Sequence, residues 1–348
     1  MHRVAVAGCG LISISKYLPI LRRIKDRASI VGICDTNGSV LRQSASTFGI
    51  PHAYVDFSEM LSQGPDIVIV CTPPSTHVGL VIEAIERGAH VLVEKPMALS
   101  LADCNKMVDA AARHHRKLGV MHNQVFNPAF ETACKVFSNG HIGDFLGMRI
   151  FLMTSVHEMT ANPEHWAHRL PGGMVGETGP HAVYLSLAFL KNVTDVHVRL
   201  KKHLPEYNWS IGEDIRFDLI AENGFSSTTL IYGSNQTAAE VDIIGTRGML
   251  RVDLQARIVI NHNRLQDIPG VRPRAVLKSL INNLFQTAIT FFMNGLRYTF
   301  SESLDGHSVG IKRFLDYVEN KEGYPATGEK GKQVQEVMEM VTSEMRQL

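Results

Sequence analysis

A glycine-rich turn directly after the first apolar run is the feature that most constrains the fold of this chain. The run at residues 3–7 is followed by Gly8, Gly10 and Ser13, in the spacing G-x-G-x-x-S. In a strand–turn–helix unit, the first glycine allows the tight turn, the second lets the backbone approach a pyrophosphate, and a small third residue lets the helix pack on the strand. The helix N-terminus then offers unpaired N–H groups to the phosphates. Pro19 disturbs a long helix, so the first turn can break before it.

An acidic residue stands at the end of the second apolar run, residues 29–34. Asp35 lies about 20 residues beyond the glycine turn, where a carboxylate accepts hydrogen bonds from the ribose diol of a dinucleotide. A 2′-phosphate would be repelled there, and the following Thr36 and Asn37 bring no cation to bind it. The pattern therefore favours NAD over NADP. The alternative is an ordinary aspartate that caps the next helix.

The first 122 residues alternate short apolar runs with helix-like segments. Continuous apolar runs that are separated by helices are typical of parallel strands buried on both faces. The remaining runs lie at 66–71, 90–93 and 117–122, and the clearest helical segments lie at 75–87 and 100–116, where Ser100 can cap the second. We therefore predict a doubly wound α/β domain over residues 1–122 that binds the dinucleotide.

The pattern changes after residue 122. Strand-like runs, several with period-two alternation, lie at 145–154, 194–202, 214–222, 225–232 and 240–244, and three helical segments at 275–298, 304–320 and 330–346 close the chain. Asn223-Gly224 is typical of a hairpin turn. The stretch 261–274 is the most loop-like. We predict a C-terminal α+β domain over residues 123–348, with a mostly antiparallel sheet, for substrate binding and oligomerisation.

Composition and charge exclude several classes of protein. The 348 residues carry 35 Lys+Arg against 34 Asp+Glu, and this balance does not predict a nucleic-acid surface. No uninterrupted apolar stretch reaches the roughly 18 residues of a membrane span, and the N-terminus lacks the pattern of a secretory signal. Five cysteines without a C-x-x-C pair fit a reducing compartment. We therefore expect a cytoplasmic protein.

Two further segments contain candidate catalytic residues. Lys95 follows the run at 90–93, and ligands of an open α/β sheet bind outside the carboxyl ends of its strands. A lysine there can bind a substrate oxygen and stabilise a developing alkoxide, unless it is an ordinary surface lysine. Glu177 and His181 are four residues apart and share a face if their segment is helical. A histidine near a carboxylate is a tunable acid or base, although such pairs are often surface contacts without function.

Together these motifs resemble those of the Gfo/Idh/MocA oxidoreductase family, which includes glucose–fructose oxidoreductase and inositol dehydrogenase. The resemblance rests on Gly8-Cys9-Gly10, Asp35, Thr72-Pro73-Pro74, Glu94-Lys95-Pro96, and Gly172-Gly173 with Glu177 and His181. It extends to residues 244–250, 314–317 and 325–329, and so covers nearly the whole chain. It implies a Rossmann domain followed by an α+β domain, and an NAD(P)-dependent oxidation or reduction of a sugar, cyclitol or related polyol.

The resemblance also implies roles for individual residues. Lys95 would hold and polarise the reacting hydroxyl, His181 would remove its proton as general base, and the hydride would pass to the nicotinamide. Glu177 stands where the family usually has Asp and reaches one methylene further. Tyr184 stands where many members have a second Asp, and Val125 replaces a frequent Arg. The reaction class survives these departures, whereas the substrate, its stereochemistry and the reaction direction stay open.

The candidate site residues can now be stated. The catalytic residues are Lys95, His181 and Glu177; the cofactor-binding residues are Gly8, Gly10, Leu11, Ile12, Asp35, Thr72, Pro73, His77, Glu94, Lys95 and Asn123; the substrate-binding residues are Lys95, Trp166, Arg169, Glu177 and His181. Trp166 could stack on a sugar or be buried in the core, and Arg169 could bind a carboxylate or phosphate. His157, His165 and His168 lack the H-E-x-x-H spacing, and we predict no metal site.

A protein of another class, one that senses NAD or a sugar without turnover, could use the same fold. Retention of both Lys95 and His181 argues against this alternative, because sensing does not need the pair. A slow reduction of NAD with one of a panel of polyols would distinguish the enzyme from the sensor.

The segment 275–298 is required by none of these motifs. Its apolar residues recur at steps of three and four and form one broad stripe: Leu277, Leu280, Ile281, Leu284, Phe285, Ala288 and Phe292. We expect a second copy of the chain, in a dimer or tetramer, to cover this stripe, with packing on the chain's own sheet as the close alternative. A lipid surface ranks third; it is suggested by the basic residues Arg272, Arg274, Lys278 and Arg297.

Overall fold

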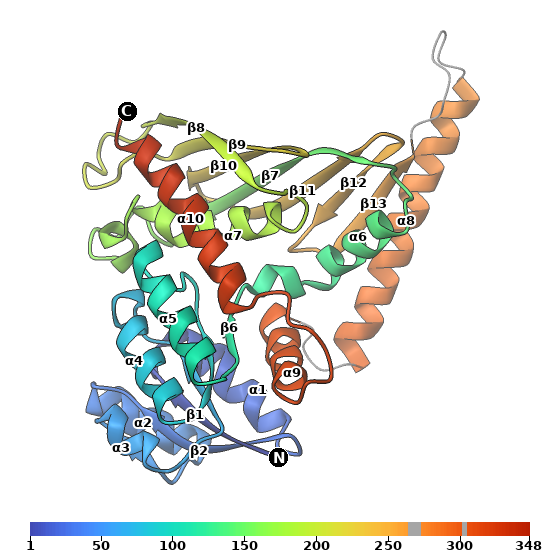
Figure 1. The fold of residues 1–348 in the computed structure, drawn as a ribbon. Helices are drawn as coiled ribbons and strands as arrows, with labels where there is room; N and C mark the ends of the chain where they lie inside the picture. The colour runs from blue at the N-terminus through green and yellow to red at the C-terminus, as the bar shows by residue number, and fades with distance from the viewer. Residues whose placement is uncertain (264–272, 301–304) are drawn as a thin grey trace. The chain divides into compact units, whose positions relative to one another are not determined.

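The computed structural model describes residues 1–263, 273–300 and 305–348 (Figure 1). The chain divides into two compact units. The first contains Met1–Asn123 and His307–Glu336, and the second contains Gln124–Gly306 and Val337–Leu348. Most of the loop expected at 261–274, Arg272 included, lies outside the described residues.

The first unit is built on a parallel sheet of six strands in the order β3-β2-β1-β4-β5-β6. The strands are β1 (His2–Ala7), β2 (Ala28–Cys34), β3 (Ala53–Tyr54), β4 (Ile67–Val70), β5 (His90–Val93) and β6 (Leu118–Val120). The strand order reverses between β1 and β4, which is the place where open α/β sheets bind their ligands. The predicted doubly wound domain is confirmed, and only the two-residue β3 was not predicted.

Helices connect these strands as the apolar pattern predicts. They are α2 (Gly38–Phe48), α3 (Phe57–Leu61), α4 (Pro74–Glu86) and α5 (Leu101–Arg113). All four residues of β4 are buried, as expected for a strand covered on both faces. Ser100 caps α5 as predicted, because its Oγ accepts the Asp103 N–H at 3.1 Å.

The first helical run does not break before Pro19. Ser13–Tyr17 form a π-helical segment, and α1 (Leu18–Arg23) follows directly. The Leu18 N–H donates to the Ser13 carbonyl, five residues back. Proline has no N–H, and its ring crowds the carbonyl four residues before it, so a widened turn at this place lets the helix continue. The side chain of Tyr17, at the end of the widened turn, is fully buried.

The second unit contains a sheet of seven strands in the order β13-β12-β11-β7-β10-β9-β8. The strands are β7 (Phe145–Ser155), β8 (Val193–Lys201), β9 (Asp214–Ala221), β10 (Gly224–Ser234), β11 (Ala238–Gly245), β12 (Gly248–Asp253) and β13 (Ile258–Asn263). Only the β7–β10 pair is parallel. The predicted mostly antiparallel sheet is therefore confirmed, as is the hairpin that joins β9 to β10.

Helices α6 (Pro128–Ser138) and α7 (Met174–Ser186) lie against this sheet, α6 near β12 and β13 and α7 near β7 and β10 (Figure 1). An aromatic cluster fills the space at the end of α6, where Phe137 packs edge-on to Phe145 and Phe189. A 28-residue helix, α8 (Pro273–Phe300), runs beside β13. It matches the predicted segment at 275–298.

The chain returns to the first unit through α9 (Gly306–Val318) and the start of α10 (Gly328–Met345). The returning strand-like segment pairs with the open edge of β6, because the Val120 N–H donates to the Ala326 carbonyl at 2.8 Å. Gly119 makes room for α9, since a Cβ at this position would lie 2.8 Å from the Phe314 ring. The edge strand β6 is therefore covered by residues some 200 positions further along.

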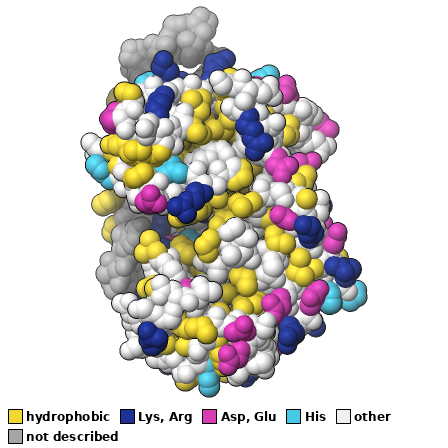
Figure 2. Space-filling model, turned by 90° about the vertical axis from the view of Figure 1, so that its left-hand side faces the viewer, with side chains coloured by type: hydrophobic (Ala, Val, Ile, Leu, Met, Phe, Trp, Pro, Cys, Tyr) yellow, Lys and Arg dark blue, Asp and Glu magenta, His cyan; other side chains and the backbone are white. Residues whose placement is uncertain are grey.

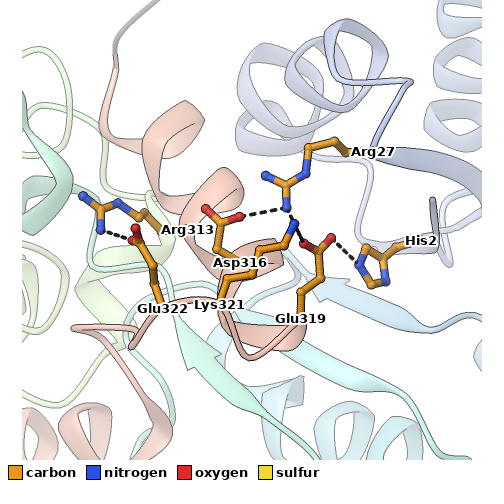
Figure 3. Close-up of polar contacts among 7 residues, drawn as sticks. All are labelled: His2, Arg27, Arg313, Asp316, Glu319, Lys321 and Glu322. Carbon is orange, nitrogen blue, oxygen red and sulfur yellow. Dashed lines mark hydrogen bonds and ion pairs between the residues drawn. The ribbon is translucent and has the colours of Figure 1, made fainter.

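Ion pairs fasten α9 to the start of the chain (Figure 3). The Arg27 guanidinium contacts Asp316 at 2.9 Å and Glu319 at 3.1 Å, and His2 contacts Glu319 at 3.0 Å. Lys321 adds a second cation beside Glu319 and, with Arg27 and His2, lowers the pKa of this carboxyl to about 2. Single exposed pairs contribute little, but several charges on shared partners form a network.

Charges of both signs are mixed on the face of the molecule that Figure 2 draws. Figure 2 shows basic, acidic and histidine side chains interspersed among apolar ones on the face drawn, in keeping with the near balance of 35 Lys+Arg and 34 Asp+Glu. Among the described helices, none combines the length and the apolar character that a membrane crossing requires.

The half-buried ring of His90 accepts a backbone hydrogen bond, which predicts that the first unit is sensitive to acid. The Lys117 N–H donates to Nδ1 of His90 at 2.8 Å, so this nitrogen must be unprotonated. Burial, with Arg116 and Lys117, lowers the pKa of His90 to about 4. Because the folded pKa is depressed, the stabilisation is complete above the ordinary value near 6.5 and is lost as the pH falls toward 4.

His90→Asn should remove this dependence, since an amide oxygen accepts the same N–H without titrating. We expect the wild type to lose about 1–2 kcal/mol of unfolding free energy relative to the variant between pH 6.5 and 4. Denaturant unfolding at a series of pH values measures the difference. The exposed His52→Asn serves as control and should follow the wild type; parallel curves for His90→Asn and the wild type would contradict the assignment.

Candidate active site

The glycine turn lies between the ends of β2 and β4. Gly8 has φ +93°, and a Cβ there would lie 2.7 Å from the Cys71 carbonyl oxygen, so only glycine fits. A Cβ at Gly10 would meet no atom within 4 Å. The side chain of Leu11 is 84% exposed and so does not cover the turn. The turn therefore has the close packing at Gly8 and the open backbone at Gly10 that a pyrophosphate requires.

The carboxylate of Asp35 is held beside this turn. One oxygen accepts the Cys9 N–H and the other accepts the Asn37 N–H, both at 2.8 Å. Asp35 does not cap the next helix, because the Asn37 side chain does so through the Ser39 and Val40 N–H groups. The donor set thus fits a dinucleotide: a turn for the phosphates, and a fixed carboxylate at the end of β2 for a ribose.

A buried carboxylate lies next to Lys95. Glu94 is 7% exposed; its Oε1 accepts the Tyr17 hydroxyl proton at 2.7 Å and faces Nε2 of His307 at 3.6 Å. Its Oε2 accepts the Lys95 N–H at 3.0 Å. Burial alone would raise the pKa of Glu94, but His307, the Tyr17 hydrogen bond and the Lys95 charge lower it. Glu94 is therefore an ionised group that fixes the backbone of Lys95.

His77 supports the two loops that follow β4 and β5. It is fully buried, with Nε2 at 2.9 Å from the Thr72 carbonyl and Nδ1 at 3.1 Å from the carbonyls of Pro96 and Met97. Burial lowers its pKa below the ordinary value. Pro73, in contrast, is exposed. Of these expected cofactor-binding residues, His77 thus lies beneath the loops, whereas Thr72 and Pro73 form their surface.

In the second unit, α7 presents two polar side chains. Of its 13 residues only Glu177 and His181 are not buried, so the predicted pair shares one face. Glu177 lies in the first turn, and its charge acts on His165 and Tyr232. Gly173, with φ +58°, precedes the helix. Glu177 and His181 are therefore the two half-buried side chains of a helix whose other residues are buried.

Tyr184 is bonded to His181. The Tyr184 hydroxyl lies 2.5 Å from Nδ1 of His181 and accepts the Gln124 N–H at 3.1 Å. An Nδ1–H that donates to this oxygen would put the lone pair of the neutral imidazole on Nε2. The Tyr184 hydroxyl thus links the His181 ring to the backbone of Gln124.

The loop before α7 carries the other expected substrate residues. Trp166, in a 3₁₀ turn (Trp166–Arg169), is 41% exposed, so it is not a core residue. Arg169 contacts Glu164 at 3.3 Å, and both side chains are largely exposed. His168 Nε2 lies 3.1 Å from the carbonyls of Met159 and Asn162 and so shapes the loop. Across residues 1–263, 273–300 and 305–348 no group of three suitable side chains could hold a metal ion.

Three cysteines lie in or near the glycine turn, and their thiols are unreactive. Cys9, Cys34 and Cys71 are buried, and all five cysteines of the chain are free thiols. Burial raises the pKa of Cys9 to about 11 and that of Cys34 to about 12. Since the thiolate is the reactive form, these groups act as small core residues.

Sequence reasoning missed Tyr17 and His307. Both contact Glu94, and their rings pack edge-on at 5.8 Å. No motif marks either residue, because the partners are separated by 77 positions in one case and by more than 200 in the other. The one signal in the sequence is the position of Glu94 directly after a buried strand, because a carboxylate that becomes buried there needs partners.

Comparison with known proteins places the chain among oxidoreductases. Residues 2–122 match the model described as "Oxidoreductase family, NAD-binding Rossmann fold", and residues 130–251 match the GFO/IDH/MocA C-terminal domain. The chain is 32% identical over 271 residues to a D-apiose dehydrogenase from Paraburkholderia graminis, covering 75% of this chain and 69% of that protein. Over 142 residues, 40% of this chain and 42% of the other, it is 32% identical to a myo-inositol 2-dehydrogenase from Thermotoga maritima.

Solved structures share the fold. The WlbA dehydrogenase from Bordetella pertussis, in complex with NADH and UDP-GlcNAcA, has a TM-score of 0.75 at 18% identity, covering 99% of this chain and 96% of that chain. An oxidoreductase domain protein from Kribbella flavida has a TM-score of 0.78 at 19% identity, covering 100% and 98%. With the glycine turn, the fixed Asp35 and the two matched domain models, this chain is an NAD-binding enzyme of the GFO/IDH/MocA oxidoreductase family.

Proposed function

We propose that the enzyme transfers a hydride between NAD and a hydroxyl-bearing carbon of a sugar, cyclitol or related polyol. The observation that carries the proposal is the 32% identity to a D-apiose dehydrogenase over 75% of the chain. Lys95 and His181, which the family resemblance assigns to catalysis, are both present. A free sugar or polyol is favoured over a nucleotide-linked one, because the D-apiose dehydrogenase shares 32% identity with this chain, whereas the dehydrogenase in complex with UDP-GlcNAcA shares 18%.

The chain's own residues would divide the chemistry as follows. The Lys95 ammonium binds the substrate hydroxyl oxygen and stabilises the negative charge that develops there. The Nε2 atom of His181 accepts the hydroxyl proton, and the C–O bond becomes a carbonyl as the hydride leaves the same carbon. Bound NAD supplies the acceptor for that hydride. In the reverse direction His181 returns the proton and Lys95 polarises the carbonyl.

Two contacts would keep these groups in place. Glu94 holds the Lys95 backbone through its N–H, and Tyr184 holds the His181 ring through Nδ1. Glu177, on the same face of α7 as His181, would bind a further substrate hydroxyl and raise the basicity of the site. Trp166 and Arg169, both exposed on the preceding loop, would contact the rest of the sugar.

Cofactor binding would use the glycine turn and the loops that follow the strands of the first sheet. Gly8, Gly10, Leu11 and Ile12 would face the pyrophosphate, Asp35 the ribose, and Thr72, Pro73 and Asn123 the nicotinamide half. His77 and Glu94 would support this site from below, since both are buried.

We further propose that the enzyme works in the cytoplasm as a homo-oligomer. Five free thiols and an NAD requirement suit a reducing compartment. Exposed apolar side chains of the second sheet, Ile220, Phe225 and Ile244, flank Gly147 on one face and would suit contact with a second copy. A particle mass above that of one chain in light scattering is expected.

The proposal is tested by following NAD reduction with D-apiose, other pentoses, hexoses and myo-inositol. We expect turnover with at least one of them, and Lys95→Ala and His181→Ala should each lower kcat on that substrate by roughly 10²–10⁴. NAD affinity, measured by fluorescence, should change little. Near wild-type turnover in either variant would refute its role, and a panel with no turnover despite tight NAD binding would favour the sensor.

Tyr184→Phe tests the orientation of His181. The variant removes only the hydroxyl that contacts Nδ1, so kcat should fall by about 10-fold or more while KM changes little. The limb of the kcat–pH profile that reports the base should shift as well, which a merely structural defect would not cause. Tyr207→Phe, a tyrosine elsewhere in the second unit, is the control; equal profiles for Tyr184→Phe and the wild type would speak against the contact.

Cofactor preference is tested at Asp35. Asp35→Ala combined with Thr36→Arg removes the ribose acceptor and adds a partner for a 2′-phosphate, so NAD should bind about 10-fold or more weaker and NADP tighter. Fluorescence titration with both cofactors measures the change. Thr36→Arg alone should keep its preference for NAD; a wild type that already prefers NADP would overturn the assignment.

A further inference from the structure

The helix α8 turns its polar side toward its own protein. Gln286 accepts the Asn261 N–H at 2.8 Å and donates to the Asn261 carbonyl at 3.2 Å, so its amide pairs with the backbone of β13. Asn283 lies 3.3 Å from Nδ1 of His262 on the same strand. Thr287 and Thr290 are also half-buried. The contact between α8 and the sheet is therefore made by hydrogen-bonding side chains rather than by an apolar stripe.

The apolar side of α8 faces solvent. Leu280, Ile281, Leu284, Phe285, Phe291 and Phe292 are between 57% and 75% exposed. Large apolar side chains that are exposed together on one helix face mark a surface that contacts a partner or a membrane. The predicted alternative that this stripe packs on the chain's own sheet is wrong for these residues, because the polar face occupies that position.

The width of the exposed face distinguishes a seam between two paired helices from a membrane interface. With 3.6 residues per turn, these six side chains spread over about 140° of the helix circumference. A seam between two paired helices uses a narrower stripe, whereas a helix that lies in a membrane interface buries a broad face.

The charge of α8 also favours a lipid surface. The segment Pro273–Phe300 contains three basic residues, Arg274, Lys278 and Arg297, and no acidic residue. Two copies that packed through this helix would bring together segments of the same positive charge, whereas an anionic lipid surface would complement that charge.

We propose that α8 docks the enzyme on an anionic lipid surface, as a helix that lies in the plane of the interface with its Leu, Ile and Phe side chains among the acyl chains. The helix does not cross the bilayer, in keeping with the hydropathy of the described helices. Its polar face, bonded to β13, would hold the second unit against the membrane.

The test is sedimentation of the purified full chain with phosphatidylcholine vesicles that contain or lack phosphatidylglycerol. The wild type should bind the anionic vesicles about 10-fold or more tightly than the neutral ones, and added salt should weaken this binding. Leu284→Gln combined with Phe285→Gln should lower binding to anionic vesicles by about 10- to 100-fold, because two apolar side chains no longer enter the membrane.

The control removes two apolar side chains of similar exposure elsewhere, Val55→Gln with Leu348→Gln, and should bind vesicles like the wild type. Light scattering and NAD titration accompany each variant, and folded variants should keep the wild-type mass and NAD affinity.

Absence of vesicle binding by the wild type, or equal binding by the α8 variant, overturns the proposal. A smaller particle for the α8 variant, without a vesicle effect, would show that a second copy covers the helix. If that variant loses NAD binding, Leu280→Gln with Ile281→Gln repeats the test.

Discussion

The carboxylate of Glu94 is the contact on which the site in the first unit depends. A buried carboxylate is costly unless it is paired and hydrogen-bonded, and Glu94 meets this need with Tyr17, His307 and the Lys95 N–H. These partners come from the first helical run, from α9 and from the loop after β5. The residue that fixes Lys95 therefore also requires that α9 return to the first unit.

Much of the fold could be predicted because its signals are local. Continuous apolar runs identified the parallel strands, alternation identified the strands of the second sheet, and Ser100 identified the start of a helix. The return of residues 307–336 to the first unit could not be predicted, since it depends on contacts such as Arg27 with Asp316 between positions 289 apart. The unbroken helix at Pro19 was also missed, because a π-helical segment leaves no mark in the periodicity.

The candidate site divides in the same way. Gly8 and Asp35 sit in short motifs whose geometry follows from the backbone, so their placement beside one another was expected. The common face of Glu177 and His181 on α7 followed from their spacing of four. The spacing of three between His181 and Tyr184 indicates that the two side chains can meet on a helix. Their contact was not predicted, because Tyr184 was considered only as a departure from the family pattern. The sequence alone did not determine whether Trp166 lies in the core or at the surface, and its exposed side chain places it at the surface.

The pairing of Gln286 with Asn261 has a consequence for solubility. As the last strand of its sheet, β13 carries backbone groups that face away from β12, and such an edge is a template onto which a strand of another molecule can add. The Gln286 amide offers one donor and one acceptor, as a neighbouring strand would, and occupies both groups of Asn261. A side chain of α8 thereby occupies one place on this edge where a strand of another molecule could pair.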